Sequence, residues 1–76
     1  MVQLGAWRSE AEARDGWAVA QSMAANILGE LSPLIIRAEL PGRGVYYRLR
    51  IAASGPVSQF CAVLMQKGLA CIPARD

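Results

Sequence analysis

The side chains with the clearest chemical potential lie on predicted strands. Over residues 45–52, Tyr46, Arg48 and Arg50 alternate with apolar residues, and Gln3 occupies the corresponding position in an alternating segment at the amino end. A tyrosine ring beside guanidinium and amide groups offers a flat apolar surface together with several hydrogen-bond donors. This combination suits sugars, and it also suits nucleobases, which stack on aromatic rings. The same residue types are equally ordinary on a solvated strand.

The composition argues against catalysis. The chain has no histidine, which removes the usual general base, zinc ligand and physiological pH switch. Its two cysteines, Cys61 and Cys71, cannot complete a structural zinc site by themselves. Gly42-Arg43-Gly44 is a turn and not a phosphate-binding loop, and Asn26 is the one asparagine available for an acylphosphatase-like cradle. We therefore expect a binding module that is not an enzyme and has no cofactor or metal.

Length and charge narrow the class further. The 76 residues form one small domain, residues 1–76, and 54% of them are apolar while 18% are charged, which excludes a disordered segment. No apolar run approaches the roughly 20 residues of a membrane-spanning helix, so we expect no membrane insertion by this segment. The net charge of +2 does not predict binding to nucleic acid. Residues 1–5 do not resemble a signal peptide, so an exported domain would be a piece of a longer protein with its signal upstream.

The first half of the chain predicts a strand followed by a long helix. Residues 1–7 alternate with a period of two, with Gln3 and Gly5 outward. Ser9 and Glu12 form a capping-box pattern at the start of an Ala-rich helix, which Gly29 or the following Ser32-Pro33 should end. The residues predicted to form its apolar face are Ala13, Trp17, Ala20, Ala24, Ile27 and Leu31.

The second half predicts a hairpin, a helix and a short edge strand. Residues 34–40 and 45–52 flank the Gly-rich turn, and we expect Ile35 and Arg37 to face outward with Tyr46. A helix follows Pro56, and residues 69–73 form the last strand. The predicted fold is α+β: a βαββαβ two-layer sandwich of the ferredoxin-like or RNP-like kind, with a four-stranded antiparallel sheet and two helices on one face. The other face of the sheet is then open.

Three segments, in order, resemble the SPOR (sporulation-related) family. The segments are residues 2–7 (VQLGAW), the hairpin with residues 42–50 (GRGVYYRLR), and the closing part with Phe60, Cys61, Gly68 and Cys71-Ile72. The resemblance covers nearly the whole chain. It implies the same order of elements and a non-catalytic module of the bacterial envelope. SPOR domains bind peptidoglycan, favouring glycan strands stripped of stem peptides, and bring their host protein to the division septum.

The resemblance also implies a binding surface. Gln3, Tyr46, Arg48 and Ile72 match positions of the family's binding face, and Ala6 stands where the family often has serine. Arg50, outward on the same predicted strand, completes the candidate set. The partner implied is the peptidoglycan glycan strand, the location is the periplasm or cell envelope, and the host protein would be anchored there. The alternatives for the same sheet face are a protein-interaction surface and a single-stranded nucleic-acid surface.

The residues after the third predicted strand depart from the family's pattern. Residues 51–54 stand before Gly55-Pro56, where the family has Gly-Pro-Phe directly after the strand, so Phe60 is assigned to the core. Trp17 belongs to the helix face and Trp7 to the core or its rim. In an oxidising envelope Cys61 and Cys71 would form a disulfide; the alternative is a pair of small buried thiols.

Overall fold

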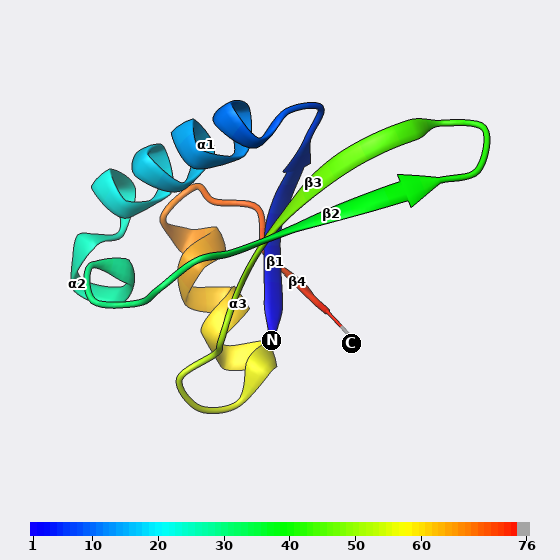
Figure 1. Ribbon diagram of the computed structural model, residues 1–76. Helices are drawn as coiled ribbons and strands as arrows, with labels where there is room; N and C mark the ends of the chain where they lie inside the picture. Colours follow the sequence, from blue (N-terminus) through cyan, green and yellow to red (C-terminus); the bar gives the residue numbers. More distant parts are fainter. Residues whose placement is uncertain (75–76) are drawn as a thin grey trace.

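The structure is a computed structural model and describes residues 1–74. In chain order its elements are β1 (Val2–Trp7), α1 (Glu10–Met23), α2 (Ala25–Leu28), β2 (Leu34–Leu40), β3 (Gly44–Ile51), α3 (Val57–Gln66) and β4 (Ile72–Pro73). The strands form one antiparallel sheet in the order β2-β3-β1-β4. All three helices lie on one side of it (Figure 1). The predicted α+β fold with an open sheet is confirmed.

The β2–β3 hairpin forms where the sequence predicts it. Gly42 and Gly44 have φ angles of 74° and 90°, a backbone conformation that is accessible to glycine at little cost. The Arg43 amide donates to the Leu40 carbonyl at 3.0 Å and closes the turn. The far end of the hairpin extends well beyond the helices (Figure 1), so that end has no helix on either face.

Helix α1 begins as the capping box predicts but ends earlier. The Ser9 hydroxyl accepts a hydrogen bond from the Glu12 amide at 3.1 Å, as in a standard N-cap. The predicted continuous helix to Gly29 is wrong, because Ala24 leaves the helical conformation with φ −136° and ψ 50°. The break starts the one-turn helix α2, which buries Leu28 completely while Ile27 is only partly buried.

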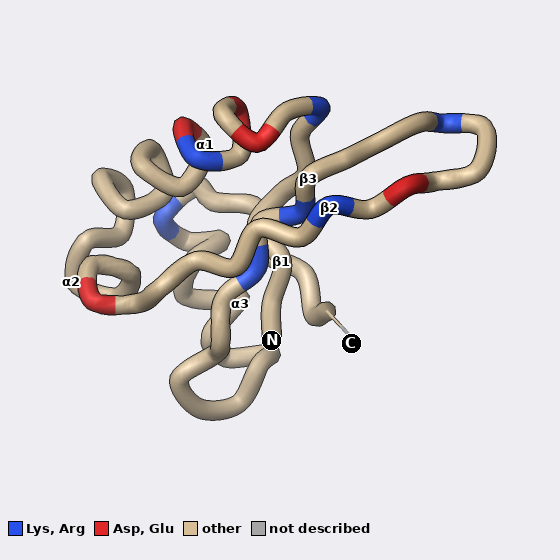
Figure 2. Tube along the Cα trace, in the orientation of Figure 1, with Lys and Arg blue, Asp and Glu red and all other residues tan. Residues whose placement is uncertain are grey.

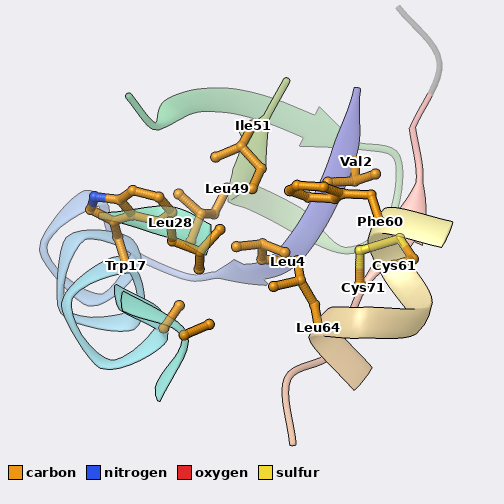
Figure 3. Packing of buried hydrophobic residues seen from close by; sticks show 12 residues of the cluster. Val2, Leu4, Trp17, Leu28, Leu49, Ile51, Phe60, Cys61, Leu64 and Cys71 are labelled. Carbon is orange, nitrogen blue, oxygen red and sulfur yellow. A yellow bond between two sulfur atoms is a disulfide. The ribbon is translucent and has the colours of Figure 1, made fainter. Parts of the chain in front are cut away.

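The core lies between the helices and the inner face of the sheet (Figure 3). Val2, Leu49 and Ile51 from the sheet and Leu64 from α3 have no exposed surface. Trp17 and Phe60 are buried in the same cluster, as predicted. Burial of such side chains contributes about 1.5–3 kcal/mol each, which a domain of this size needs for stability.

Helix α3 is joined covalently to the last strand. Cys61 and Cys71 form a disulfide with a Cα–Cα distance of 5.2 Å (Figure 3), and both cysteines are buried. Gly68, with φ 89°, ends the helix, and the Leu69 amide returns to the Leu64 carbonyl. The two-residue strand β4 is therefore positioned next to β1 by a disulfide as well as by strand pairing.

Candidate ligand-binding face

The sheet face that no helix covers is the candidate site, and we call it the open face. Its members are the residues that strand register places opposite to the buried side of the sheet. They are Gln3 and Ala6 of β1, Leu34, Ile36, Ala38 and Leu40 of β2, Tyr46, Arg48 and Arg50 of β3, and Ile72 of β4, with Arg8 beside Tyr46. All six candidate residues predicted from the sequence lie in this set.

A β-bulge in β1 determines which of its residues reach the open face. Gln3 pairs with Arg50, but Gly5 pairs with Leu49, so one residue, Leu4, is inserted between them. The expectation that Gly5 faces outward is wrong, because the bulge turns it to the helix side. The Trp7 ring covers it there, and a Cβ on Gly5 would meet the ring at 2.7 Å. The same shift places Ala6 outward and exposed, opposite Arg48.

The register of β2 corrects a second expectation. Ile35 pairs with buried Leu49 and packs against the core, so it does not face outward as predicted. Arg37 pairs with Tyr47 and also lies on the helix side of the sheet, although it is exposed because the hairpin has passed beyond the helices. Ile36, opposite Arg48, takes the outward position. The open face is therefore more apolar along β2 than the sequence predicted.

The polar side chains of the open face form a row from Gln3 and Arg50 at one end to Arg8 and Tyr46 at the other, and we call it the polar row. Gln3 and Arg50 form its buried end. The Arg50 Nε donates to the Gln3 Oε1 at 3.1 Å. Arg50 is only 9% exposed, whereas Gln3 is half-buried. An arginine Nε–H is a donor only, so this contact fixes the oxygen of the Gln3 amide toward Arg50 and the nitrogen away from it.

Arg8 is a member of the site that sequence reasoning missed. Its guanidinium carbon lies 4.7 Å from the centroid of the Tyr46 ring, a cation–π geometry. Its Nη1 donates to the Tyr46 hydroxyl at 3.0 Å and to the Arg43 carbonyl at 3.1 Å. The sequence gives no local signal for it, because the outward position of Ala6, two residues earlier, depends on the bulge in β1. One face of the Tyr46 ring is therefore occupied by Arg8.

Arg48 occupies the middle of the open face. Its cross-strand neighbours are Ala6 on one side and Ile36 on the other. Glu39, an acidic residue of the neighbouring strand, is not placed to form a salt bridge with Arg48, because Glu39 pairs with Val45 and lies on the opposite face of the sheet. The residue opposite Arg48 on β1 is therefore one with a short side chain, Ala6.

The β4 edge adds an apolar border. Ile72 pairs with Gln3 and is 56% exposed. Between β1 and β4 lies a shallow, mainly apolar hollow of about 90 Å³, lined by Gln3, Gly5, Ala70 and Ile72 among others. The Gln3 amide therefore lies between the arginines of the open face and this small apolar hollow.

The charge of the open face is of one sign. Basic residues gather where β1, β2 and β3 lie side by side (Figure 2), and the strand register places Arg48 and Arg50 on the open face and Arg37 on the helix side. The acidic residues within 1–74 lie elsewhere, on α1, after α2, or on the helix side of β2. The ion pair recorded in this part of the chain, Glu10–Arg14 at 3.8 Å, is exposed on α1. The face therefore carries three guanidinium groups, from Arg8, Arg48 and Arg50, without a carboxylate among its described residues.

Other site classes find no support in the described residues. Within 1–74 no group of three histidine, cysteine or acidic side chains is arranged to hold a metal ion. In the same range no helix has the length and hydrophobicity needed to cross a membrane. Comparison of the chain with protein-family models, with curated proteins and with solved structures found no match. The resemblance to the SPOR family thus stays a prediction from the residues.

Proposed function

We propose that this domain is a non-catalytic module that binds peptidoglycan glycan strands on the open face. The single observation that carries the proposal is the composition of that face. Within residues 1–74 it contains arginines, an amide and a tyrosine but no carboxylate, and apolar side chains border it. Sugars with C–H faces, acetamido groups and carboxylates are chemically complementary to such a surface.

Each contact of the proposed complex has a simple chemical basis. Arg48 would bind the lactyl carboxylate that muramic acid exposes once its stem peptide is removed, in a charge-assisted hydrogen bond about twice as strong as a neutral one. The free face of Tyr46 would pack on a pyranose ring. Gln3 would contact an acetamido group whose methyl enters the hollow beside Ile72.

The cellular role follows from this ligand preference. Glycan strands without stem peptides form where amidases act on the septal wall, so a domain that prefers them brings its host protein to the division site. We propose a periplasmic or envelope location for the same reason, and the buried disulfide is compatible with an oxidising compartment. The ligand preference and the location both derive from the resemblance to SPOR domains.

A nucleic-acid ligand is less well supported by the same face. Single-stranded nucleic acids are bound by several aromatic side chains on which successive bases stack. Within residues 1–74, Tyr46 is the one aromatic residue on the open face, because Tyr47 and Trp7 pair with each other on the helix side. A protein ligand for this face has no observation in its favour, and both ligand classes serve as outcomes of the test.

The test is co-sedimentation of the purified domain with peptidoglycan sacculi before and after amidase treatment. We expect stronger retention on the treated wall, where the carboxylates are free and the stem peptides are gone. Single-stranded DNA at the same ionic strength is the comparison polymer. No retention on either wall preparation contradicts the proposal, and retention by DNA alone would favour the nucleic-acid alternative.

A matched pair of variants locates the site. Arg48→Ala removes a guanidinium from the open face, and Arg37→Ala removes one from the helix side of the neighbouring strand. Both substitutions change the net charge equally, so a nonspecific electrostatic effect weakens both to the same extent. We expect Arg48→Ala to lower retention about tenfold and Arg37→Ala to leave it within about twofold.

A further inference from the structure

We propose that Arg50 and Arg8 are positioning residues that make the open face a surface of hydrogen-bond donors. They bind the acceptor atoms of Gln3 and Tyr46, so that both side chains turn donors toward the ligand. The site then selects groups that only accept hydrogen bonds, namely carboxylates and acyl carbonyls, over hydroxyl-rich neutral sugars. This inference rests on the proposed function and specifies its substrate class.

The Arg50–Gln3 contact carries the first half of the inference. A primary amide carries one acceptor oxygen and two donor hydrogens, and it can present either end to a ligand if nothing orients it. Here the Gln3 oxygen is 3.1 Å from the Nε of a largely buried arginine. Reversing the amide would place its N–H groups against another N–H donor, which is unfavourable. The Gln3 nitrogen is therefore the atom available to the ligand.

The Arg8–Tyr46 contact repeats this arrangement at the other end of the polar row. The Arg8 Nη1 donates to the Tyr46 hydroxyl at 3.0 Å, so the phenol oxygen acts as acceptor toward the protein. Within residues 1–74 the Tyr46 hydroxyl donates no hydrogen bond to another residue, so its hydrogen can be donated to a ligand. The cation–π contact holds the ring and guanidinium together and limits rotation of both.

The rest of the face contains few competing acceptors. Arg48 offers donors only, and no carboxylate lies on the face among the described residues. Over residues 47–50 the main chain of β3 pairs with β1 on one side and with β2 on the other, and these ladders use its carbonyls. A ligand hydroxyl that must donate finds few partners among these side chains, while acceptor groups spaced along a glycan strand find separate donors in Gln3, Arg48 and Tyr46.

The first experiment measures selectivity on the intact domain. The probes are soluble peptide-free glycan strands with free carboxylates, the same strands after methyl esterification, and N-acetylglucosamine oligomers, which lack carboxylates. We expect affinity to fall about tenfold on esterification and further for the oligomers, since charge-assisted contacts are replaced by neutral ones. Equal affinity for all three probes overturns the inference.

The second experiment separates positioning from a merely structural role. A double-mutant cycle compares Arg50→Met, Gln3→Ala and the double variant, each checked for folding by thermal unfolding. If Arg50 acts through Gln3, Arg50→Met weakens binding about three- to tenfold alone and has no further effect when Gln3 is absent. Arg50→Lys, whose ammonium can still donate to the amide oxygen, restores most of the affinity.

The same logic applies to the second arginine. Arg8→Met should reduce selectivity for the free carboxylate, and Tyr46→Phe should remove the effect of that substitution. In wild-type protein labelled with ¹⁵N, the Gln3 side-chain NH₂ resonances should shift as glycan is added. The shift of these resonances tests whether the Gln3 amide nitrogen contacts the glycan, even if Arg50→Met does not fold.

Two outcomes are kept apart by this design. If the wild-type domain binds none of the glycan probes, the proposed function is wrong. If it binds them, but the two substitutions of the cycle act independently or the Gln3 amide resonances stay in place, the proposed function survives and the positioning role is wrong.

Discussion

The two faces of the sheet use neighbouring residues of the same strand for different purposes. On β3, Leu49 is fully buried against the helices, while Arg48 points to the open face between Ala6 and Ile36. The helix side contains mainly apolar groups in close contact, and the open side contains donors held in place by one another. The stability of the domain and its proposed recognition are therefore assigned to alternate positions of one strand.

This difference makes the two sets of residues separable by experiment. Buried apolar groups contribute to the free energy of unfolding because they are removed from water, and their loss leaves a cavity. Exposed polar groups on a strand contact water in both the unfolded and the folded state, so they contribute little to the free energy of unfolding. Substitutions of buried residues on the helix side should mainly change stability. Substitutions of exposed residues on the open face should change binding without a comparable change in stability.

The largest effect is expected for Leu49→Ala. The side chain has no exposed surface, so its truncation should lower the free energy of unfolding by about 2–5 kcal/mol, a large part of the total for a small domain. Urea denaturation followed by circular dichroism measures it. Leu34→Ala is the matched control, because the same side chain on the open face is 46% exposed. Equal losses for the two leucines would contradict the assignment of the faces.

Removal of the disulfide is expected to have the second-largest effect. The bond closes a loop between residues ten apart, Cys61 and Cys71, and the loop-entropy model gives about 2.5–3 kcal/mol for it. Unfolding of the Cys61→Ser/Cys71→Ser variant, compared with oxidised wild type, measures this term. Mass spectrometry after alkylation should show modified thiols only after reduction. Free thiols in protein purified from an oxidising compartment would exclude the bond.

Gly16→Ala should lower the free energy of unfolding by less than the loss of the disulfide does. The sign of its effect tests the position of Trp7. Alanine in a helix interior is ordinarily favoured over glycine by about 0.5–1 kcal/mol. At Gly16 of α1, however, a Cβ would lie 2.6 Å from Cη2 of the Trp7 ring. Displacing the ring should outweigh the helix preference, for a net loss of about 1 kcal/mol in thermal unfolding. A stabilised Gly16→Ala protein would mean that Trp7 does not lie on this side of the sheet.

The fold was predictable because its signals are local. The alternation around Tyr46 and Arg48, the glycines of the turn and the Ser9–Glu12 cap each depend on residues a few positions apart. The assignment of Arg48 and Arg50 to the open face followed from the apolar residues between them. The structure agrees at each of these positions.

The errors arose where geometry depends on distant neighbours. The bulge at Leu4 has no local signature, yet it exchanges the faces of Gly5 and Ala6. In the apolar run 34–36, alternation is uninformative, and the charge of Arg37 suggested an outward row that the register places on the helix side. Arg8 lies outside any strand, so its contact with a residue 38 positions away was not predictable.

The smallest effect on stability, and the most specific effect on binding, is expected for Arg48→Ala. Removal of this half-buried side chain should change the free energy of unfolding by less than about 0.5 kcal/mol. In wild type, glycan affinity should fall as ionic strength rises, because the Debye length shrinks from about 10 Å at 0.1 M salt to about 3 Å at 1 M. The fall should be shallower in Arg48→Ala, which has lost one charged contact with the ligand, and unchanged in Arg37→Ala. Equal salt dependence in all three proteins, measured by co-sedimentation, would place the ligand on a different surface from the open face.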